Sequence, residues 1–485
     1  MADPPNVLLL VTDQHRPDVL GYAGDPIVRT PTLDWLAETG TVFTNAYTPA
    51  PVCVPARHSM RTGQLPRTWD RFGFDAFESP MYRTLPLQLA RHGYMSACGG
   101  KMHYPGWNQH QGWRKRIGPT PMKQHGIGDG HIPEPAPGAD TGSLSRWKWT
   151  IGEELGRAGI AESRTQIQDR RVVEGVEQFL REYFSSPVYD RAQPETPLLL
   201  QTSLIEPHYP YFAADRDRFT YYLNRVEPFI EATPDVHPFI DDARTAGECR
   251  IVRPGTDANP RSIRRATAAY YAMIETVDAL FGRVIDAMRH HGEDPDEWLI
   301  AFTADHGELL GERGMWGKGQ FLESSARVPL VVRYPEAFDP SVVDQNVNLC
   351  DLYATICDVA DVPVPSNRDS RSMVPLLAGE TSSWRNETIS QGVGNKSLVR
   401  GVDSAELMIK RDDLKYCYFG ETHGEVLFDL ARDPGESQNV IDESRYREDV
   451  TAFRRRRGEL GYGPNADATY RDAGYDAGTR VEDTS

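Results

Sequence analysis

The stretch NVLLLVTDQ, residues 6–14, places five consecutive apolar residues directly before polar ones. A short, continuous apolar run is typical of a strand buried on both faces, as in parallel sheets. In open α/β sheets, functional side chains follow the carboxyl ends of the strands. Thr12, Asp13 and Gln14 are therefore candidate site residues.

Helices and strands are expected to alternate along the first three-quarters of the chain. Helices are predicted from Thr30 and Pro31 to Gly40, from Leu85 to His92 before Gly93, along Val173 to Tyr183, and from a Ser262 cap to Gly292. Strands are predicted at Pro197 to Ile205 and Trp298 to Thr303. This alternation predicts an α/β fold with a large, mostly parallel central sheet flanked by helices. Three polar clusters should converge on one sheet edge: Thr12 to His15, Glu206 to His208 and Ala304 to Gly307.

The alternation of predicted helices and strands ends at about Pro363. Short runs predict a smaller C-terminal α+β subdomain with an antiparallel sheet, at Ser397 to Val402, Leu407 to Lys410, Lys415 to Phe419 and Val426 to Leu430. We assign residues 1–375 to a catalytic domain and 376–485 to this subdomain and a polar tail. Tyr104 to Thr150 and Pro207 to Arg261 are predicted to be long irregular segments.

Composition excludes several classes of protein. The chain has 485 residues, 25% of them charged, and a net charge of −17. Such an acidic protein is not expected to bind nucleic acid or an anionic membrane. The N-terminus lacks a basic region and a long apolar run, and no stretch approaches the roughly 20 apolar residues of a membrane span. Six scattered cysteines suit reduced thiols, so a cytoplasmic location is expected. The oligomeric state is not readable from the sequence.

The segment Cys53-Val54-Pro55-Ala56-Arg57 resembles the C-x-P-x-R signature of the sulfatases. Other segments resemble further motifs of that family in the same order: Thr12-Asp13-Gln14, Gly99-Gly100-Lys101-Met102-His103, Glu206-Pro207-His208, Asp305-His306-Gly307, Trp316-Gly317-Lys318 and the run from Leu427 to Pro434. The chain is thus similar to formylglycine-dependent sulfatases of the alkaline-phosphatase-like superfamily.

The resemblance implies a modified residue and a metal. Cys53 would be oxidised to formylglycine (3-oxoalanine) by a formylglycine-generating enzyme, and the hydrated aldehyde would be a gem-diol nucleophile. One divalent metal would be bound by five residues: Asp13, Gln14, the modified Cys53, Asp305 and His306. Donors that are mainly oxygen favour Ca²⁺, while the imidazole leaves Mn²⁺ or Mg²⁺ open.

The resemblance also implies roles for charged residues and histidines. Arg57, Lys101 and Lys318 would stabilise negative charge on the transferred group. His103 would take a proton from the formylglycine hydroxyl, and His208 would protonate the leaving group. Directly after the metal motif, His15 and Arg16 are candidate substrate contacts. An aromatic and basic wall for the substrate is a further hypothesis, formed by Trp107, Trp113, Arg114, Lys115, Arg116, Trp147 and Trp149.

Three departures from the common sulfatase pattern leave the substrate open. Gln14 stands where many similar sequences have Asp, His306 where many have Asn, and Gln64 where Arg is usual. The first two also occur in choline-sulfatase-like and phosphonate-monoester-hydrolase-like branches. The leading hypothesis is hydrolysis of a sugar, aryl or small alkyl sulfate. The alternatives are a phosphonate monoester or phosphodiester hydrolase with the same nucleophile, and an inactive ligand-binding protein with unmodified Cys53.

Overall fold

The computed structural model describes residues 4–68, 83–104, 108–118, 151–185, 196–229, 249–251, 258–393, 405–420 and 424–462. The predicted run Ser397 to Val402 lies outside these ranges, as does most of the segment from Tyr104 to Thr150, including Trp107, Trp147 and Trp149.

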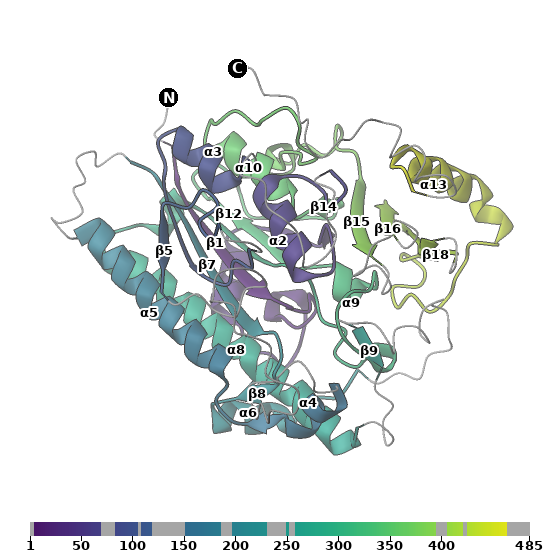
Figure 1. Cartoon of the computed structure of the whole chain (residues 1–485), viewed down its shortest axis with the longest axis horizontal. Helices are drawn as coiled ribbons and strands as arrows, with labels where there is room; N and C mark the ends of the chain where they lie inside the picture. The colour runs from purple at the N-terminus through teal and green to yellow at the C-terminus, as the bar shows by residue number, and fades with distance from the viewer. Residues whose placement is uncertain are drawn as a thin grey trace, which may run out of the picture.

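A mixed, mostly parallel eight-stranded sheet forms the centre of the molecule (Figure 1). Its order is β13-β2-β12-β10-β1-β7-β4-β5. Strand β12 runs antiparallel to both of its neighbours, and the other neighbouring pairs are parallel. The strands are β1 (Asn6–Asp13), β2 (Thr41–Phe43), β4 (Met95–Gly100), β5 (Lys115–Ile117), β7 (Leu198–Pro207), β10 (Trp298–Ala304), β12 (Leu330–Arg333) and β13 (Ser341–Val343).

Strand β1 is buried on both faces, as its apolar run predicts. Val7, Leu9 and Val11 belong to one hydrophobic cluster, and Leu8 and Leu10 to another on the opposite face. Successive side chains of a strand point to opposite faces, so a continuous apolar run supplies both cores at once.

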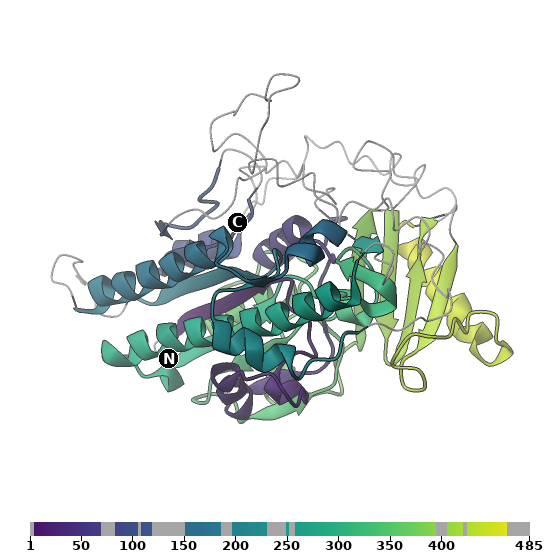
Figure 2. The same cartoon turned by 90° about the horizontal axis from the view of Figure 1, so that it is seen from below.

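Helices cover both faces of this sheet, and the long helices α5 and α8 run side by side (Figures 1 and 2). One face is covered by α1 (Pro31–Glu38), α5 (Arg164–Ser185) and α8 (Pro260–His290). The other is covered by α2 (Cys53–Thr62), α3 (Leu85–Arg91), α10 (Asp351–Val359) and α11 (Val374–Leu377).

The expected helices and buried strands are confirmed, but one predicted helix start is wrong. The side chain of Asn259 accepts a hydrogen bond from the Arg261 amide, and Pro260 occupies the first position of α8. Ser262 is therefore inside the helix. Asn is among the strongest N-cap residues and Pro suits the first turn, so this pair begins the helix earlier than predicted.

The C-terminal part contains a four-stranded antiparallel sheet, which confirms that prediction (Figure 2). Its strands are β15 (Glu387–Val393), β16 (Ala405–Arg411), β17 (Leu414–Tyr418) and β18 (Glu425–Asp429). One face packs against α13 (Arg447–Glu459) and the other against Tyr47 and Phe321 of the large part. The sequence did not predict β15, and the boundary at residue 375 stays a prediction.

A buried ion cluster joins this sheet to the rest of the chain. Lys415 lies 2.9 Å from Glu323 and 2.5 Å from Glu436. Glu323 begins α9 (Glu323–Ala326), so the charges connect β17 to the connection between β10 and β12. Removing one partner of such a buried pair leaves an uncompensated charge, which is costly.

Short elements occur in both segments predicted to be irregular. Strand β5 lies in the first, and β8 (Phe212–Ala213), α6 (Arg216–Leu223) and β9 (Cys249–Ile251) lie in the second. Their two- and three-residue strands pair with distant partners, so the local sequence carries little signal for them. The remaining short elements are β3 (Ala46–Tyr47), β6 (Gly159–Ile160), β11 (Met315–Gly317), β14 (Val347–Asn348), α4 (Ile151–Arg157), η1 (Gly21–Ala23), η4 (Pro295–Glu297), η5 (Glu312–Gly314) and η7 (Ser444–Tyr446).

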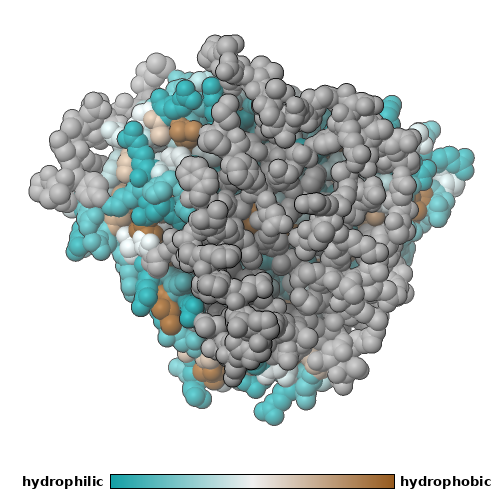
Figure 3. All heavy atoms as spheres, viewed as in Figure 1, coloured by the Kyte–Doolittle hydropathy of each residue, from teal (hydrophilic) through white to brown (hydrophobic). Residues whose placement is uncertain are grey.

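The coloured surface in Figure 3 is mainly hydrophilic, with hydrophobic residues scattered singly. Within the described ranges, the large hydrophobic residues that are exposed are Ile160, Val342 and Val364. A search of the same ranges finds no helix with the length and apolar character needed to cross a bilayer.

Candidate active site

The carboxyl ends of β1, β7 and β10 meet at one edge of the central sheet. Strand β1 lies between the other two and runs parallel to both. Thr12 is paired with Ala304, and Asp13 with Pro207. The predicted convergence of the three polar clusters on one sheet edge is confirmed.

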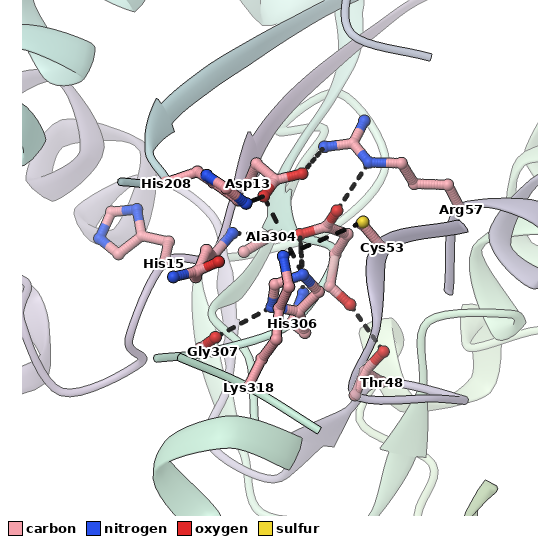
Figure 4. A network of polar contacts seen from close by, with 12 residues as sticks. Asp13, His15, Thr48, Cys53, Arg57, His208, Ala304, His306, Gly307 and Lys318 are labelled. Atoms are coloured by element: carbon pink, nitrogen blue, oxygen red, sulfur yellow. Dashed lines mark hydrogen bonds and ion pairs between the residues drawn. The ribbon is translucent and has the colours of Figure 1, made fainter. Parts of the chain in front are cut away.

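Cys53 is the first residue of helix α2 and is 2% exposed. Its Sγ atom lies 4.0 Å from Nζ of Lys318 (Figure 4). Just before the helix, the Thr48 hydroxyl donates to the Asp305 carbonyl oxygen at 2.6 Å, which ties this turn to the end of β10. The helix N-terminus and the lysine both favour negative charge at this position.

Arg57 lies one turn after Cys53 and joins three strand ends. Its Nη2 donates to Asp13 at 3.1 Å (Figure 4). Its Nε donates to Asp305 at 2.6 Å. Its Nη1 donates to the Ser203 hydroxyl at 2.8 Å and to the Lys101 carbonyl oxygen at 2.5 Å. A planar guanidinium can serve several acceptors in fixed directions, which a single ammonium cannot.

Lys101 completes this charged cluster. Its Nζ lies 2.5 Å from Oδ2 of Asp13, and its backbone amide donates to the Ser203 carbonyl oxygen at 2.8 Å. Burial alone would raise the pKa of Asp13, but the charges of Lys101 and Lys318 outweigh it and hold that pKa well below its usual value. Asp13 is therefore ionised in the folded protein.

The donor atoms for a cation are grouped in the same place. One ligand atom each from Asp13, Cys53 and His306 lie within 4.8 Å of one another. Asp13 Oδ1, Gln14 Oε1 and His306 Nε2 are buried without a hydrogen-bond partner among the described residues. His306 Nδ1 bonds to the Gly307 carbonyl oxygen at 2.9 Å, so Nδ1 carries the proton and Nε2 keeps its lone pair. This set fits a divalent metal.

The two candidate proton carriers are both buried near these groups. His208 follows β7, and its Nε2 lies 3.9 Å from Asp13 Oδ1 (Figure 4). Its Nδ1 bonds to the Tyr209 carbonyl oxygen at 2.7 Å. Burial and then the charge of Lys318 lower the pKa of His208, and burial and the charge of Lys101 lower that of His103. Both imidazoles are neutral near pH 7.

His15 and Arg16 are directed away from this cluster into other contacts. The His15 ring packs edge-on against Phe302 and lies apart from the other labelled groups in Figure 4. Arg16 pairs with Asp18 at 2.7 Å and Glu312 at 3.0 Å. Substrate contact by either residue stays a prediction, and Arg16 would first have to break these ion pairs.

The proposed aromatic and basic wall is described only in part. Trp113 is 4% exposed and belongs to the hydrophobic core, and its Nε1 donates to the Tyr104 hydroxyl at 2.7 Å. Lys115 and Arg116 lie on β5 at the sheet edge, and Arg114 precedes them. Trp113 is therefore an anchor of this segment in the core.

Two residues of the site were missed by the sequence analysis. The Ser203 hydroxyl accepts a hydrogen bond from Arg57, and the Glu308 carboxylate accepts one from the side-chain amide of Gln14. Burial raises the pKa of the Glu308 carboxyl, while hydrogen bonds from Leu310 and Gly317 limit the rise. Glu308 follows Asp305-His306-Gly307 directly, so its place beside that motif was the one available signal.

Comparisons with known proteins agree with this fold and motif order. The sulfatase family model matches residues 5–362, and the model of the C-terminal region of N-sulphoglucosamine sulphohydrolase matches residues 311–460. The arylsulfatase of Clostridium perfringens is 28% identical over 479 residues, which cover 93% of each chain. The choline-sulfatase of Rhizobium meliloti is 30% identical over 462 residues, covering 93% of this chain and 85% of that protein.

Solved structures share this fold. The phosphonate monoester hydrolase of Agrobacterium radiobacter matches with a TM-score of 0.73 at 22% identity, covering 94% of this chain and 95% of that one. A structure in complex with its substrate D-glucosamine-2-N,6-O-disulfate matches with a TM-score of 0.72 at 18% identity, covering 98% and 100%. The fold is that of the alkaline-phosphatase-like hydrolases. Within it, the chain belongs to the sulfatase family, and it is a sulfuric ester hydrolase.

Proposed function

We propose that this enzyme hydrolyses a sulfate monoester with a formylglycine nucleophile made from Cys53 and a divalent metal. One observation carries the proposal: the Cys53 thiol, the Asp13 carboxylate and the His306 imidazole lie within 4.8 Å, beside the Lys318 ammonium. A nucleophile, metal donors and a cation for the sulfate group thus occupy one buried site.

The metal would be held by Asp13, Gln14, Asp305, His306 and the modified residue 53. A bound divalent ion would supply Lewis-acid polarisation of the nucleophile and the ester oxygens. The oxygen-rich donor set favours Ca²⁺, and the imidazole also suits Mn²⁺. Asp305 Oδ1 accepts from the backbone amides of Gln14 and His306, which fixes the carboxylate in place.

The cations would hold the sulfate group and stabilise its charge. The Lys101 ammonium lies beside the Asp13 carboxylate, and the Lys318 ammonium lies beside the sulfur of Cys53. Preorganised charges of this kind gain strength in a buried site, because little water screens them. Arg57 is fully engaged by Asp13, Asp305 and Ser203, so its role is to position the nucleophile-bearing helix and the carboxylates.

The two histidines would move protons in opposite directions. His103 is neutral, which suits a base that accepts a proton from a hydroxyl of residue 53. His208 holds its Nδ1 proton against the Tyr209 carbonyl oxygen and directs Nε2 into the site. The charge of a bound anionic ester would raise the pKa of His208 and favour its use as an acid for the leaving group.

The relatives support a sugar, aryl or small alkyl alcohol as the leaving group. Their names include an arylsulfatase and a choline-sulfatase, both matched over most of this chain. A formylglycine-generating enzyme would be the partner in maturation.

The test combines mass spectrometry of the Cys53 peptide with assays of protein co-expressed with a maturation enzyme. An aryl sulfate, an aryl phosphonate monoester and an aryl phosphodiester are compared. We expect an aldehyde at residue 53 and dominant sulfate turnover that is lost in Cys53→Ala. Cys357→Ala is the matched control, since Cys357 is a buried cysteine of α10 in the hydrophobic core, and it should retain activity.

Other outcomes would favour the alternatives. Dominant phosphonate or diester turnover would assign the chain to the second candidate, a phosphonate monoester or phosphodiester hydrolase, whose fold it shares. A retained thiol in protein co-expressed with the maturation enzyme, with no turnover of any ester, would support a binding protein and refute the proposal.

A further inference from the structure

Glu308 is a buried carboxylate that contacts the proposed metal donor Gln14 and the backbone of Gly317, the residue before Lys318. Its Oε1 accepts from the amides of Leu310 at 2.8 Å and Gly317 at 2.7 Å. Its Oε2 accepts from the Gln14 side-chain amide and from the Tyr211 hydroxyl at 3.3 Å. Four donors surround the carboxylate: two backbone amides, one side-chain amide and one hydroxyl.

These contacts decide the orientation of the Gln14 amide. A side-chain amide has a donating NH₂ end and an accepting oxygen end. The Glu308 carboxylate accepts from the NH₂ end, so the amide oxygen of Gln14 points away from Glu308. Gln14 Oε1 is buried and has no hydrogen-bond donor within the described ranges. A buried oxygen of this kind requires another partner, and a cation is one.

The backbone of Gln14 is held independently of its side chain. Its φ is +63°, its amide donates to Asp305 Oδ1 at 3.1 Å, and its carbonyl oxygen accepts from the Tyr270 hydroxyl at 2.7 Å. The main chain at Gln14 is therefore fixed on both sides of the residue. Rotation of the terminal amide is the freedom that Glu308 removes.

We propose that Glu308 is a positioning residue that turns the oxygen of Gln14 toward the metal. The inference rests on the metal site of the proposed function. The same carboxylate also holds the amide of Gly317, the residue before Lys318. One buried group thus fixes a metal donor and the start of the segment that carries a cation for the substrate.

The substitution Glu308→Gln tests this role with almost no change in volume. The two backbone donors keep the new carbonyl oxygen in the place of Oε1, so the new NH₂ faces the NH₂ of Gln14. The Gln14 amide must then turn over to accept, which presents NH₂ to the metal. We expect Ca²⁺ affinity to fall about 10–100-fold, as is typical when a partner of a metal ligand is removed.

A reciprocal exchange should reverse the loss. In the double variant Gln14→Glu with Glu308→Gln, one oxygen of the new carboxylate accepts from the new amide and the other faces the metal. We expect this variant to bind Ca²⁺ more tightly than Glu308→Gln alone. Glu436→Gln is the control, because Glu436 is also a buried glutamate and pairs with Lys415. It should leave Ca²⁺ affinity unchanged.

The measurement is calorimetric titration of chelator-stripped protein, in separate experiments with Ca²⁺ and with Mn²⁺, with thermal unfolding in chelator as the check of folding. If the wild type binds no Ca²⁺ or Mn²⁺, the metal site itself is refuted. If the wild type binds Ca²⁺ and Glu308→Gln binds it equally well, only the role of Glu308 is refuted. Should the single variant not fold, the double variant is compared with Gln14→Ala. Binding no tighter than Gln14→Ala would overturn the inference.

Discussion

Replacing Arg57 by Met should destabilise the enzyme, and the extent should depend on bound metal. The guanidinium bridges Asp13 and Asp305, all three side chains being buried. In the variant, Lys101 still pairs with Asp13 at 2.5 Å, so Asp305 is the carboxylate that loses its cation. Breaking a buried pair in this way costs about 3–5 kcal/mol.

The corresponding shift in Tm follows from the length of the chain. An unfolding entropy of about 2 cal/mol/K per residue gives about 1 kcal/mol/K when 485 residues unfold together. The metal-free variant should therefore unfold about 3–5 °C below the wild type. A bound divalent ion would compensate the charge of Asp305, so the difference should shrink when the comparison is made in saturating Ca²⁺.

Differential scanning calorimetry in chelator and in Ca²⁺ measures both effects. Arg333→Met is the control, because Arg333 is another buried arginine and pairs with Asp296 at the protein surface. The decrease in Tm of this control should be the same with and without Ca²⁺. Two results would contradict the pairing of Arg57 with the metal-binding carboxylates. One is a decrease in the Tm of Arg57→Met that does not depend on Ca²⁺, and the other is an unchanged Tm in chelator.

Three further predictions concern other parts of the structure. Burial lowers the pKa of His15 to about 4, from about 6.5 when unfolded, so the neutral side chain contributes stability above pH 6.5 that is lost as the pH falls toward 4. In His15→Gln, the free energy of unfolding from chemical denaturation should lose this dependence on pH, which amounts to up to about 3 kcal/mol. An unchanged dependence on pH would contradict the prediction. Gly100→Ala would place a Cβ 1.8 Å from the Ser203 carbonyl oxygen, at a φ of +90°, and should abolish activity, whereas Gly93→Ala, with open space around its Cβ, should fold and retain activity in the same assay. Lys415→Met removes the cation that pairs with the buried Glu436 and should speed proteolysis of the C-terminal sheet, while a digestion rate equal to the wild type would show that this ion cluster does not hold the sheet.

The elements with strong local patterns were predictable from the sequence. The apolar run at residues 7–11 indicated a strand buried on both faces, and the structure confirms it. The amphipathic periodicity of α8 likewise identified the longest helix, although its cap is Asn259. The parallel direction of the strands was expected from the helix–strand alternation, which is why Asp13, His208 and Asp305 could be expected at one edge.

Adjacent residues could not be sorted into site and core by their positions in the sequence. Gln14 has a φ of +63°, and the chain beyond it leaves the sheet edge. His15 therefore packs on Phe302 and Arg16 pairs with Asp18, although both follow the metal motif directly. A backbone turn of this kind depends on contacts with distant residues, here the Tyr270 hydroxyl and the Asp305 carboxylate.

The sequence by itself determined where the buried strands lie along the chain and the chemical types of the candidate site residues, because apolar periodicity and short motifs are local properties of the chain. Tertiary structure alone decided which of those residues touch. The partners of Arg57 and Gln14, which are Ser203 and Glu308, lie 146 and 294 positions away along the chain. Contacts over such separations are set by strand order and packing, and no local pattern specifies them.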